Sequence, residues 1–414
     1  MRIYTNNTSK ESRTLVEKVV NKMEGLKKPC KKFMISTLVL FLSMRGRYTF
    51  QGMGRYGELS EKSYRLHFES GFDFLDFNIK LCLERLSSSR VLAFDPSYLP
   101  KSGKCTPGKG KYWSGCLGKA VPGLEIGGLG VIDLDCRTAF HLEAIQTPCA
   151  TELQLNKSSL TDHYAQIIVE RATKLEVFSK YLAVDGYFYK QKFIEPIKEQ
   201  TTLDIICKLP KNADLKYLYK GAKRKGRGRP KKYDGKVNMK NIDKRRFKQV
   251  CKDDDAILYE AVVWAVRLKR SIKVVYVEFL DEGKSTNRCA FFFSTDLTLK
   301  AKSIYQFYKA RFQIEFLFRD AKQFTGLTHC QARSKNKIHF HVNTSLSAVS
   351  VAKIAHYIDK EKSDFKSFSI SDIKTSYLNE MMLDLFLSNF EINPELTKNK
   401  QAINRILDFG KIAA

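Results

Sequence analysis

The chain has 414 residues, 43% of them hydrophobic, and a formal charge of +28 from 72 basic and 44 acidic side chains. This length allows two or three domains, and the hydrophobic content excludes general disorder. So large a positive excess favours a polyanionic partner. The longest apolar run, over residues 33–44, is too short to span a bilayer, so we expect no membrane partner.

Residues 1–88 are predicted to be helical. Apolar spacing places helices over 12–26 and 31–44, and Ser60 is an N-cap candidate for a third. Between the second and third helices, GMGRYGELS is predicted to be a Gly-broken turn. The third helix carries Lys62 and Arg65, which suits a DNA-reading helical module, although a small structural domain would show the same pattern.

Residues 89–211 alternate short apolar runs with helical patterns. The run VLAF ends on Asp95 and the run YLAV ends on Asp185. Further strands are expected over 124–135, 139–147 and 203–209, and helices over 160–175 and 190–200. This alternation indicates an α/β core with a mixed sheet.

Residues 212–296 are a basic interruption of that core. Fifteen Lys or Arg stand against three Asp between 212 and 250, and KRKGRGRPKK has no apolar residue, so we expect a mobile arm or loop there. Strands over 256–267, 272–279 and 288–294 could form a small sheet. Trp264 lies on the first of them, as a core side chain or as a platform on which a base stacks.

The segment RGRP within this basic run is the core of an AT-hook. Arg227 and Arg229, followed by Lys231, would lie in the narrow minor groove of A·T tracts, where the negative potential attracts arginine. A solvated basic linker has the same composition and would contact phosphates alone.

The stretch YKARFQIEFLFRDAK, residues 308–322, is predicted to be one helix with two different faces. One face carries Ala310, Ile314, Leu317 and Ala321 and suits a core. The other carries Tyr308, Arg311, Glu315, Arg319 and Lys322. A single carboxylate surrounded by cations and a phenol suits a metal ion beside a phosphate backbone, but a solvated helix face would also tolerate these residues.

Asp95 and Asp185 each have an ordinary explanation, because Asp after a strand is a common turn former or helix cap. Together with Glu315 they could hold a pair of Mg²⁺ ions for phosphoryl displacement. We interpret Asp133, Asp135 and Asp204 as structural. The four residues His329, Cys330, His339 and His341 do not have the spacing of a zinc finger, and the ten cysteines include no CxxC pair, so we expect reduced thiols.

The pattern Y-x2-R-x3-E-x6-K, met by Tyr308, Arg311, Glu315 and Lys322, resembles the signature of bacterial insertion-sequence transposases of the DDE class. The resemblance extends to Asp95 before a Lys-Gly loop, to VDGYF around Asp185, and to FFFSTD ahead of the signature. It implies an RNase H-like catalytic core with a β-rich insertion.

The resemblance also implies roles for these residues. Asp95, Asp185 and Glu315 would be the catalytic and metal-binding triad, with two Mg²⁺ ions and Mn²⁺ as a substitute. Tyr308, Arg311 and Lys322 would contact phosphates near the cleaved end, and Arg319 is predicted to be a further backbone contact. Related transposases stack an extruded base on an aromatic residue of the insertion, which Trp264 would supply.

Five regions are expected on this basis: a helical N-terminal DNA-binding domain (1–88), the first part of the core (89–211), the basic β-rich insertion (212–296), the second part with the Glu helix (297–345), and a helical C-terminal region (346–414). The predicted function is cut-and-paste transposition from terminal inverted repeats by a homodimer acting on double-stranded DNA. We expect a bacterial cytoplasmic, nucleoid-associated protein. The alternatives are a metal-dependent nuclease without strand transfer, and a catalytically inactive sequence-specific DNA-binding protein.

Overall fold

The computed structural model describes residues 8–103, 105–222, 230–253, 255–281, 284–357, 368–390, 392–393 and 396–412. The chain divides into two compact units. The first comprises Met1–Ser88, Pro96–Cys149 and Gln313–Ala414, and the second Ser89–Asp95 and Ala150–Phe312. Strand β1 (Arg90–Pro100) contributes residues to both units.

The N-terminal part of the first unit is helical, as predicted. Its helices are α1 (Thr8–Asn21), α2 (Lys28–Ser43), α3 (Phe50–Tyr56), α4 (Glu61–Glu69) and α5 (Phe74–Leu83). The Ser60 side chain accepts the Ser63 amide at 3.3 Å and caps α4, which confirms the predicted start of that helix.

The Gly-broken turn predicted between the second and third helices is wrong, because most of it is helix α3. Thr49 caps this helix by accepting the Gly52 amide at 3.0 Å. A Cβ atom at Gly52 would lie 2.5 Å from the Arg47 carbonyl oxygen, so this glycine permits a close backbone approach inside a helix rather than breaking it.

In the rest of the first unit, the described residues form three strands and four helices besides the end of β1. These are β2 (Gly110–Ser114), β3 (Lys119–Asp133), β4 (Thr138–Gln146), α10 (Gln313–Phe324), α11 (Lys335–Tyr357), α12 (Ile370–Asn389) and α13 (Thr397–Asp408). Short helical stretches were expected after residue 358, whereas α12 has 20 residues.

Helix α11 is buried on nearly every side, and it packs against β4 through a polar contact as well as apolar ones. The Asn343 side chain accepts the Ala144 amide at 2.8 Å and donates to the Ala144 carbonyl at 2.9 Å. One side-chain amide thus satisfies both backbone groups of a strand residue, which a buried strand requires.

The second unit is built on a mixed sheet. Strands β1, β5 (Tyr181–Val184) and β6 (Asp204–Lys208) are parallel neighbours, and β12 (Lys284–Ser294) runs antiparallel to β6. The sheet continues through β11 (Arg270–Asp281), β10 (Ala256–Ala265), β7 (Leu215–Leu218) and β8 (Tyr233–Lys236), and β9 (Lys248–Lys252) pairs with β10.

The insertion strands therefore do not form a separate small sheet. Phe292, Phe293 and Ser294 of β12 pair in register with Lys208, Cys207 and Ile206 of β6, so the ladder runs from the core strands into the insertion. The short strands β7 and β8 and the start of β9 lie in the basic segment 212–250, on either side of the run KRKGRGRPKK. Residues 223–229 of that run, where a mobile arm or loop is predicted, lie outside the described residues.

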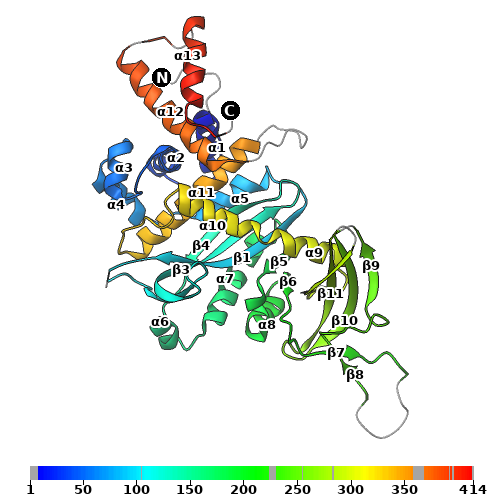
Figure 1. The fold of residues 1–414 in the computed structure, drawn as a ribbon. Coiled ribbons are helices and arrows are strands. Elements are labelled where there is room, and N and C mark those ends of the chain that lie inside the picture. The colour runs from blue at the N-terminus through cyan, green and yellow to red at the C-terminus, as the bar shows by residue number, and fades with distance from the viewer. Residues whose placement is uncertain are drawn as a thin grey trace. The chain divides into compact units, whose positions relative to one another are not determined.

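Helices cover both faces of the parallel strands of the second unit. They are α6 (Ala150–Leu155), α7 (Leu160–Leu175), the short 3-10 helix η1 (Gly186–Phe188), α8 (Gln191–Gln200) and α9 (Ala301–Ala310). In Figure 1, α7 and α8 lie on one side of β5 and β6, and α9 lies on the other. Helix α7 has the predicted bounds. The mixed α/β class is confirmed and is consistent with an RNase H-like core.

No described helix is long and apolar enough to cross a membrane.

Candidate active site

Asp95 and Asp185 each directly follow the last paired residue of two adjacent parallel strands. The paired residues of β1 and β5 are Leu92 with Leu182, Ala93 with Ala183, and Phe94 with Val184. The next residue of each chain segment is the aspartate, which lies within β1 in one case and directly after β5 in the other, and neighbouring strands lie about 4.8 Å apart. The second unit thus brings the two carboxylate-bearing residues side by side, and both are half-buried.

The strand β1 does not end at Asp95, as was expected, but continues to Pro100. Successive side chains of a β-strand point to opposite faces of the sheet, and this explains the direction of the Asp95 carboxylate. Phe94 packs against Tyr164 of α7, with 5.5 Å between ring centroids, so the next residue faces the opposite side of the sheet. That side is covered by α9.

Helix α9 brings Tyr308 and Arg311 to the two aspartates. The Tyr308 ring packs on Phe292 of β12 with 4.6 Å between centroids, and its hydroxyl donates to Asp185 Oδ1 at 3.3 Å. Arg311 Nη1 lies 3.4 Å from Asp95 Oδ1. Each of the first two signature residues therefore contacts one of the two predicted metal ligands.

Burial keeps two hydrogen-bond donors around Asp185 protonated, the Tyr308 hydroxyl and the Cys207 thiol. Burial raises the pKa of Tyr308 above its usual value, and the Asp185 charge adds to this while Arg311 opposes it. Burial likewise raises the pKa of the Cys207 thiol well above its usual range. The Cys207 Sγ donates to the Asp185 carbonyl oxygen at 3.2 Å and so fixes the backbone under the carboxylate.

The prediction of one helix over 308–322 is wrong, because the segment contains two helices. Helix α9 ends at Ala310, and the Arg311 amide is shared between the carbonyl oxygens of Phe307 and Tyr308, each at 3.2 Å. Such shared bonds are common where a helix terminates. Helix α10 then begins at Gln313, and its expected core side chains are buried: Ile314, Leu317 and Ala321.

The signature is thereby divided between the two compact units. Glu315, Arg319 and Lys322 lie on α10 of the first unit, whereas Tyr308 and Arg311 belong to the second. The Arg319 guanidinium contacts Asp320 at 3.1 Å and lies 4.6 Å from the Phe316 ring centroid.

Among the described residues, no group of three His, Cys, Asp or Glu side chains is arranged to hold a metal ion. The chemistry of Asp95 and Asp185 nevertheless fits one. Two adjacent half-buried carboxylates offer the hard oxygen ligands that Mg²⁺ and Mn²⁺ prefer.

A family model described as a transposase DDE domain matches residues 147–350. The chain belongs to the DDE transposases. Members of this family are enzymes that cleave DNA and transfer strands, they generally use divalent metal ions, and their substrate is DNA. The match includes Asp185 and the whole Tyr308 to Lys322 signature, but Asp95 lies outside it. No curated protein matches the sequence.

Other acidic residues of the transposase have structural partners. Asp133 accepts the Ser87 amide at 2.7 Å and the Ser87 hydroxyl at 2.9 Å. Asp204 accepts Lys198 Nζ at 2.6 Å and the Thr295 hydroxyl at 2.7 Å. These contacts fit the interpretation that both residues are structural.

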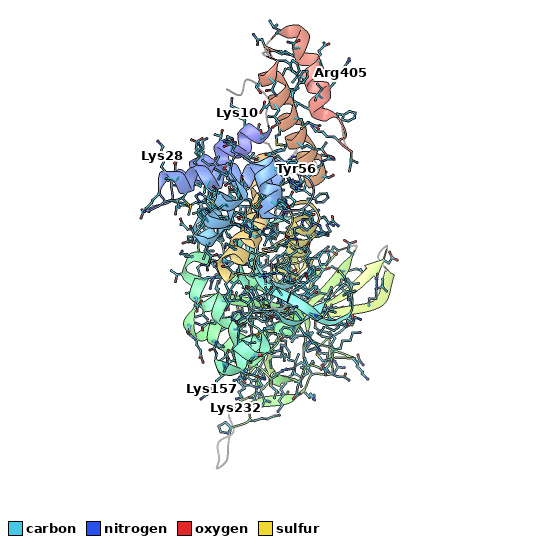
Figure 2. The ribbon with its side chains drawn as sticks, turned by 90° about the vertical axis from the view of Figure 1, so that its left-hand side faces the viewer. Lys10, Lys28, Tyr56, Lys157, Lys232 and Arg405 are labelled. Atoms are coloured by element: carbon cyan, nitrogen blue, oxygen red, sulfur yellow. The ribbon has the colours of Figure 1, made fainter. Side chains whose placement is uncertain are left out.

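The insertion of the transposase places Trp264 within an aromatic and basic cluster. Trp264 is half-buried on β10, as predicted for a strand residue, and its ring centroid lies 5.6 Å from that of Tyr233. Lys216 Nζ lies 5.3 Å from the Tyr233 centroid. Lys231 Nζ lies 2.7 Å from Asp234 Oδ1. Figure 2 labels Lys232, the next residue in the chain. Arg227 and Arg229 lie outside the described residues.

Two residues beside Asp185 were missed in the sequence, Tyr187 and Lys190. Tyr187 is 46% exposed, and Lys190 Nζ lies 3.3 Å from its ring centroid. The available signal was the aromatic and basic content of DGYFYK directly after an apolar strand, which periodicity treats only as a turn.

Proposed function

We propose that this transposase binds the terminal inverted repeats of an insertion sequence and catalyses Mg²⁺-dependent cleavage and strand transfer in cut-and-paste transposition. The observation that carries this is the adjacent placement of Asp95 on β1 and Asp185 directly after β5, with Tyr308 of α9 contacting Asp185 and Arg311, the C-cap of α9, contacting Asp95. A pair of acids at neighbouring parallel strands is suited to hold metal ions at one edge of the sheet.

Asp95, Asp185 and Glu315 are the proposed metal ligands. Bound divalent ions would stabilise the attacking and leaving oxygens of the phosphodiester. In cleavage, a water oxygen bonds to phosphorus and the 3′-oxygen leaves as the new hydroxyl; in strand transfer, that 3′-hydroxyl bonds to a target phosphorus and displaces another 3′-oxygen.

Tyr308 and Arg311 are proposed to position both the acids and the DNA. A guanidinium carries five donors, so one contact to Asp95 leaves capacity for a phosphate contact. Tyr308 remains a hydroxyl donor, because burial keeps its pKa above the usual value. Lys322 and Arg319 would bind further phosphates of the same strand.

We assign end recognition to residues 1–88 and further DNA contact to the insertion, residues 212–296. On α4 the exposed face carries Lys62, Arg65 and Leu66, at the spacing of one helical stripe. Arg65 already contacts Glu61 at 2.6 Å, so a contact to DNA would compete with this pair. In the insertion, Trp264 is proposed to stack on an extruded base.

A second copy of the chain is the proposed partner of the C-terminal region, residues 346–414. Four exposed apolar residues follow one face of α12 and its C-cap: Met382, Leu385, Phe386 and Phe390. A stripe of this kind marks a protein contact, and a homodimer provides the same stripe on both subunits.

The test incubates the protein with Mg²⁺ and a duplex from the DNA that flanks its coding region. Asp95→Asn, Asp185→Asn and Glu315→Gln should each abolish cleavage while DNA binding is retained. Asp135→Asn, an exposed acid, is the matched control and should cleave like the parent. Full cleavage by the three triad variants would refute the assignment.

The products separate the alternatives. Joined target DNA supports transposition, whereas cleavage without joining supports a nuclease on the same core. Sequence-specific binding without cleavage in Mg²⁺ or Mn²⁺ would support a DNA-binding protein that has lost catalysis.

A further inference from the structure

The segment that follows Asp185 holds two of its aromatic rings in the core and presents the third outward. Phe188 packs on Phe94 and Phe193, with 5.7 and 4.5 Å between ring centroids. Tyr189 is 2% exposed and packs on Phe293. Tyr187, between Asp185 and these anchors, is 46% exposed.

The backbone of this segment is held by its own hydrogen bonds. The Phe188 amide donates to the Asp185 carbonyl at 3.0 Å, the Tyr189 amide to Gly186 at 3.2 Å, and the Lys190 amide to Phe188 at 2.7 Å. The position of Tyr187 relative to Asp185 is therefore set by the turn itself.

Lys190 is held next to the same ring. Its Nζ lies 3.3 Å from the Tyr187 ring centroid, a close cation–π contact. The pair thus presents an ammonium and a phenolic hydroxyl together, from residues two and five positions beyond the proposed metal ligand Asp185. Both are donors to phosphate oxygens, and the Tyr187 ring is also held by Phe188, with 5.2 Å between ring centroids.

We infer that Tyr187 and Lys190 form a binding site for one backbone phosphate of the DNA strand that reaches Asp185. This inference rests on the proposed function, because it places the scissile strand beside Asp185. The site is sequence-independent: the ammonium supplies charge, the hydroxyl supplies a second donor, and the ring fixes the lysine, which reduces the entropy lost on binding.

The test measures binding of the flanking duplex by fluorescence anisotropy in Ca²⁺ over a range of salt concentrations. Lys190→Ala should reduce the slope of log K against log salt by about 1 and weaken binding about tenfold near 0.1 M salt. Lys190→Arg should restore the slope, and Tyr187→Phe should weaken binding about fivefold by removing one donor.

A matched Tyr–Lys pair at the other end of β5 provides the control. Lys180 Nζ lies 4.9 Å from the Tyr181 ring centroid and contacts Asp296 at 3.1 Å. Lys180→Ala likewise removes one ammonium next to a tyrosine ring, just before β5 instead of beyond it, and it should leave the DNA affinity at the phosphate contact unchanged.

A second measurement locates the phosphate. Single methylphosphonates are placed along the strand around the cleavage site, since each neutralises one phosphate. At one position the parent should lose about tenfold in affinity, and Lys190→Ala should lose nothing further. An unchanged salt slope with the parent's methylphosphonate profile in Lys190→Ala would overturn the inference.

Failure of the proposed function gives a different result. If the triad variants cleave as well as the parent while Lys190→Ala shows the altered slope, the metal assignment is wrong and the phosphate contact holds. Urea unfolding of every variant shows whether the protein is folded, so a folding defect is distinguished from a lost contact.

Discussion

Acid should destabilise the first unit, because two of its histidines are fully buried in neutral form. Burial lowers the pKa of His141 to about 3, against an opposing hydrogen bond to Asn343, and that of His341 to about 4, against an opposing bond to Gly326. His141 Nε2 lies 2.9 Å from Asn343 Oδ1, and His341 Nε2 lies 2.8 Å from the Gly326 carbonyl oxygen.

The magnitude follows from the difference between folded and unfolded chains. A histidine in the unfolded chain has a pKa of about 6.5, so below that pH the unfolded state binds protons that the folded state does not. Stability is therefore lost as pH falls below 6.5. At pH 5.0 each histidine costs about 2 kcal/mol, and the pair about 4 kcal/mol, relative to pH 7.5. Carboxylates contribute little in this window, because their unfolded pKa lies near 4.

The assay is urea unfolding at pH 7.5 and 5.0, followed by hydrogen exchange of the α11 amides, which report on the first unit. His341→Gln keeps a side-chain donor for Gly326 without a titrating ring, so it should lose about half of the pH dependence. An unfolding free energy that differs by less than about 1 kcal/mol between the two pH values, or an unchanged pH dependence in His341→Gln, would refute the reasoning.

Three further predictions concern the second unit, a helix cap and the proposed dimer. Arg311→Met removes the guanidinium that lies 3.4 Å from the Asp95 carboxylate, and it should lower the unfolding free energy of the second unit by about 3 kcal/mol in urea titrations. Arg311→Lys keeps the charge and should lower it less. Ser60→Ala removes the cap of α4 and should cost about 1 kcal/mol, whereas the Ser60→Asp control keeps an acceptor and should cost little. Leu385→Glu on the exposed stripe of α12 should shift the protein from dimer to monomer in light scattering, and an unchanged mass would contradict that interface.

Local pattern was enough to predict the strands and helices with clear periodicity. Helix α7 and the end of β5 before Asp185 were located correctly, because an alternation of apolar residues and a terminal acid are both visible in a short window. Helix α3 was not predicted, because glycine in a sequence normally indicates a turn. Gly52 is suited to this helix only because the Arg47 carbonyl oxygen lies too close for a Cβ atom, and that contact is not visible in the sequence.

The helix end at Arg311 could not be predicted, because the segment contains no Gly or Pro there and its polar periodicity continues into α10. The pairing of β12 with β6 was also hidden, since the partners Phe292 and Lys208 are far apart in the chain and nothing local specifies the match. For the candidate site, residue types and spacing indicated Asp95 and Asp185, but the contacts of Tyr308 and Arg311 required the structure.

Because β12 of the insertion pairs with β6 of the core, the insertion is an integral part of the core sheet and not an independently folding domain. Removal of residues 212–296 would take away the antiparallel neighbour of β6 and leave the backbone groups of β6 as an open edge next to β5, the strand that ends just before Asp185. We expect such a shortened protein to be recovered in aggregates instead of as a smaller active core, and a soluble, monodisperse deletion would contradict this. The insertion can therefore vary freely in its loops, but its last strand must persist.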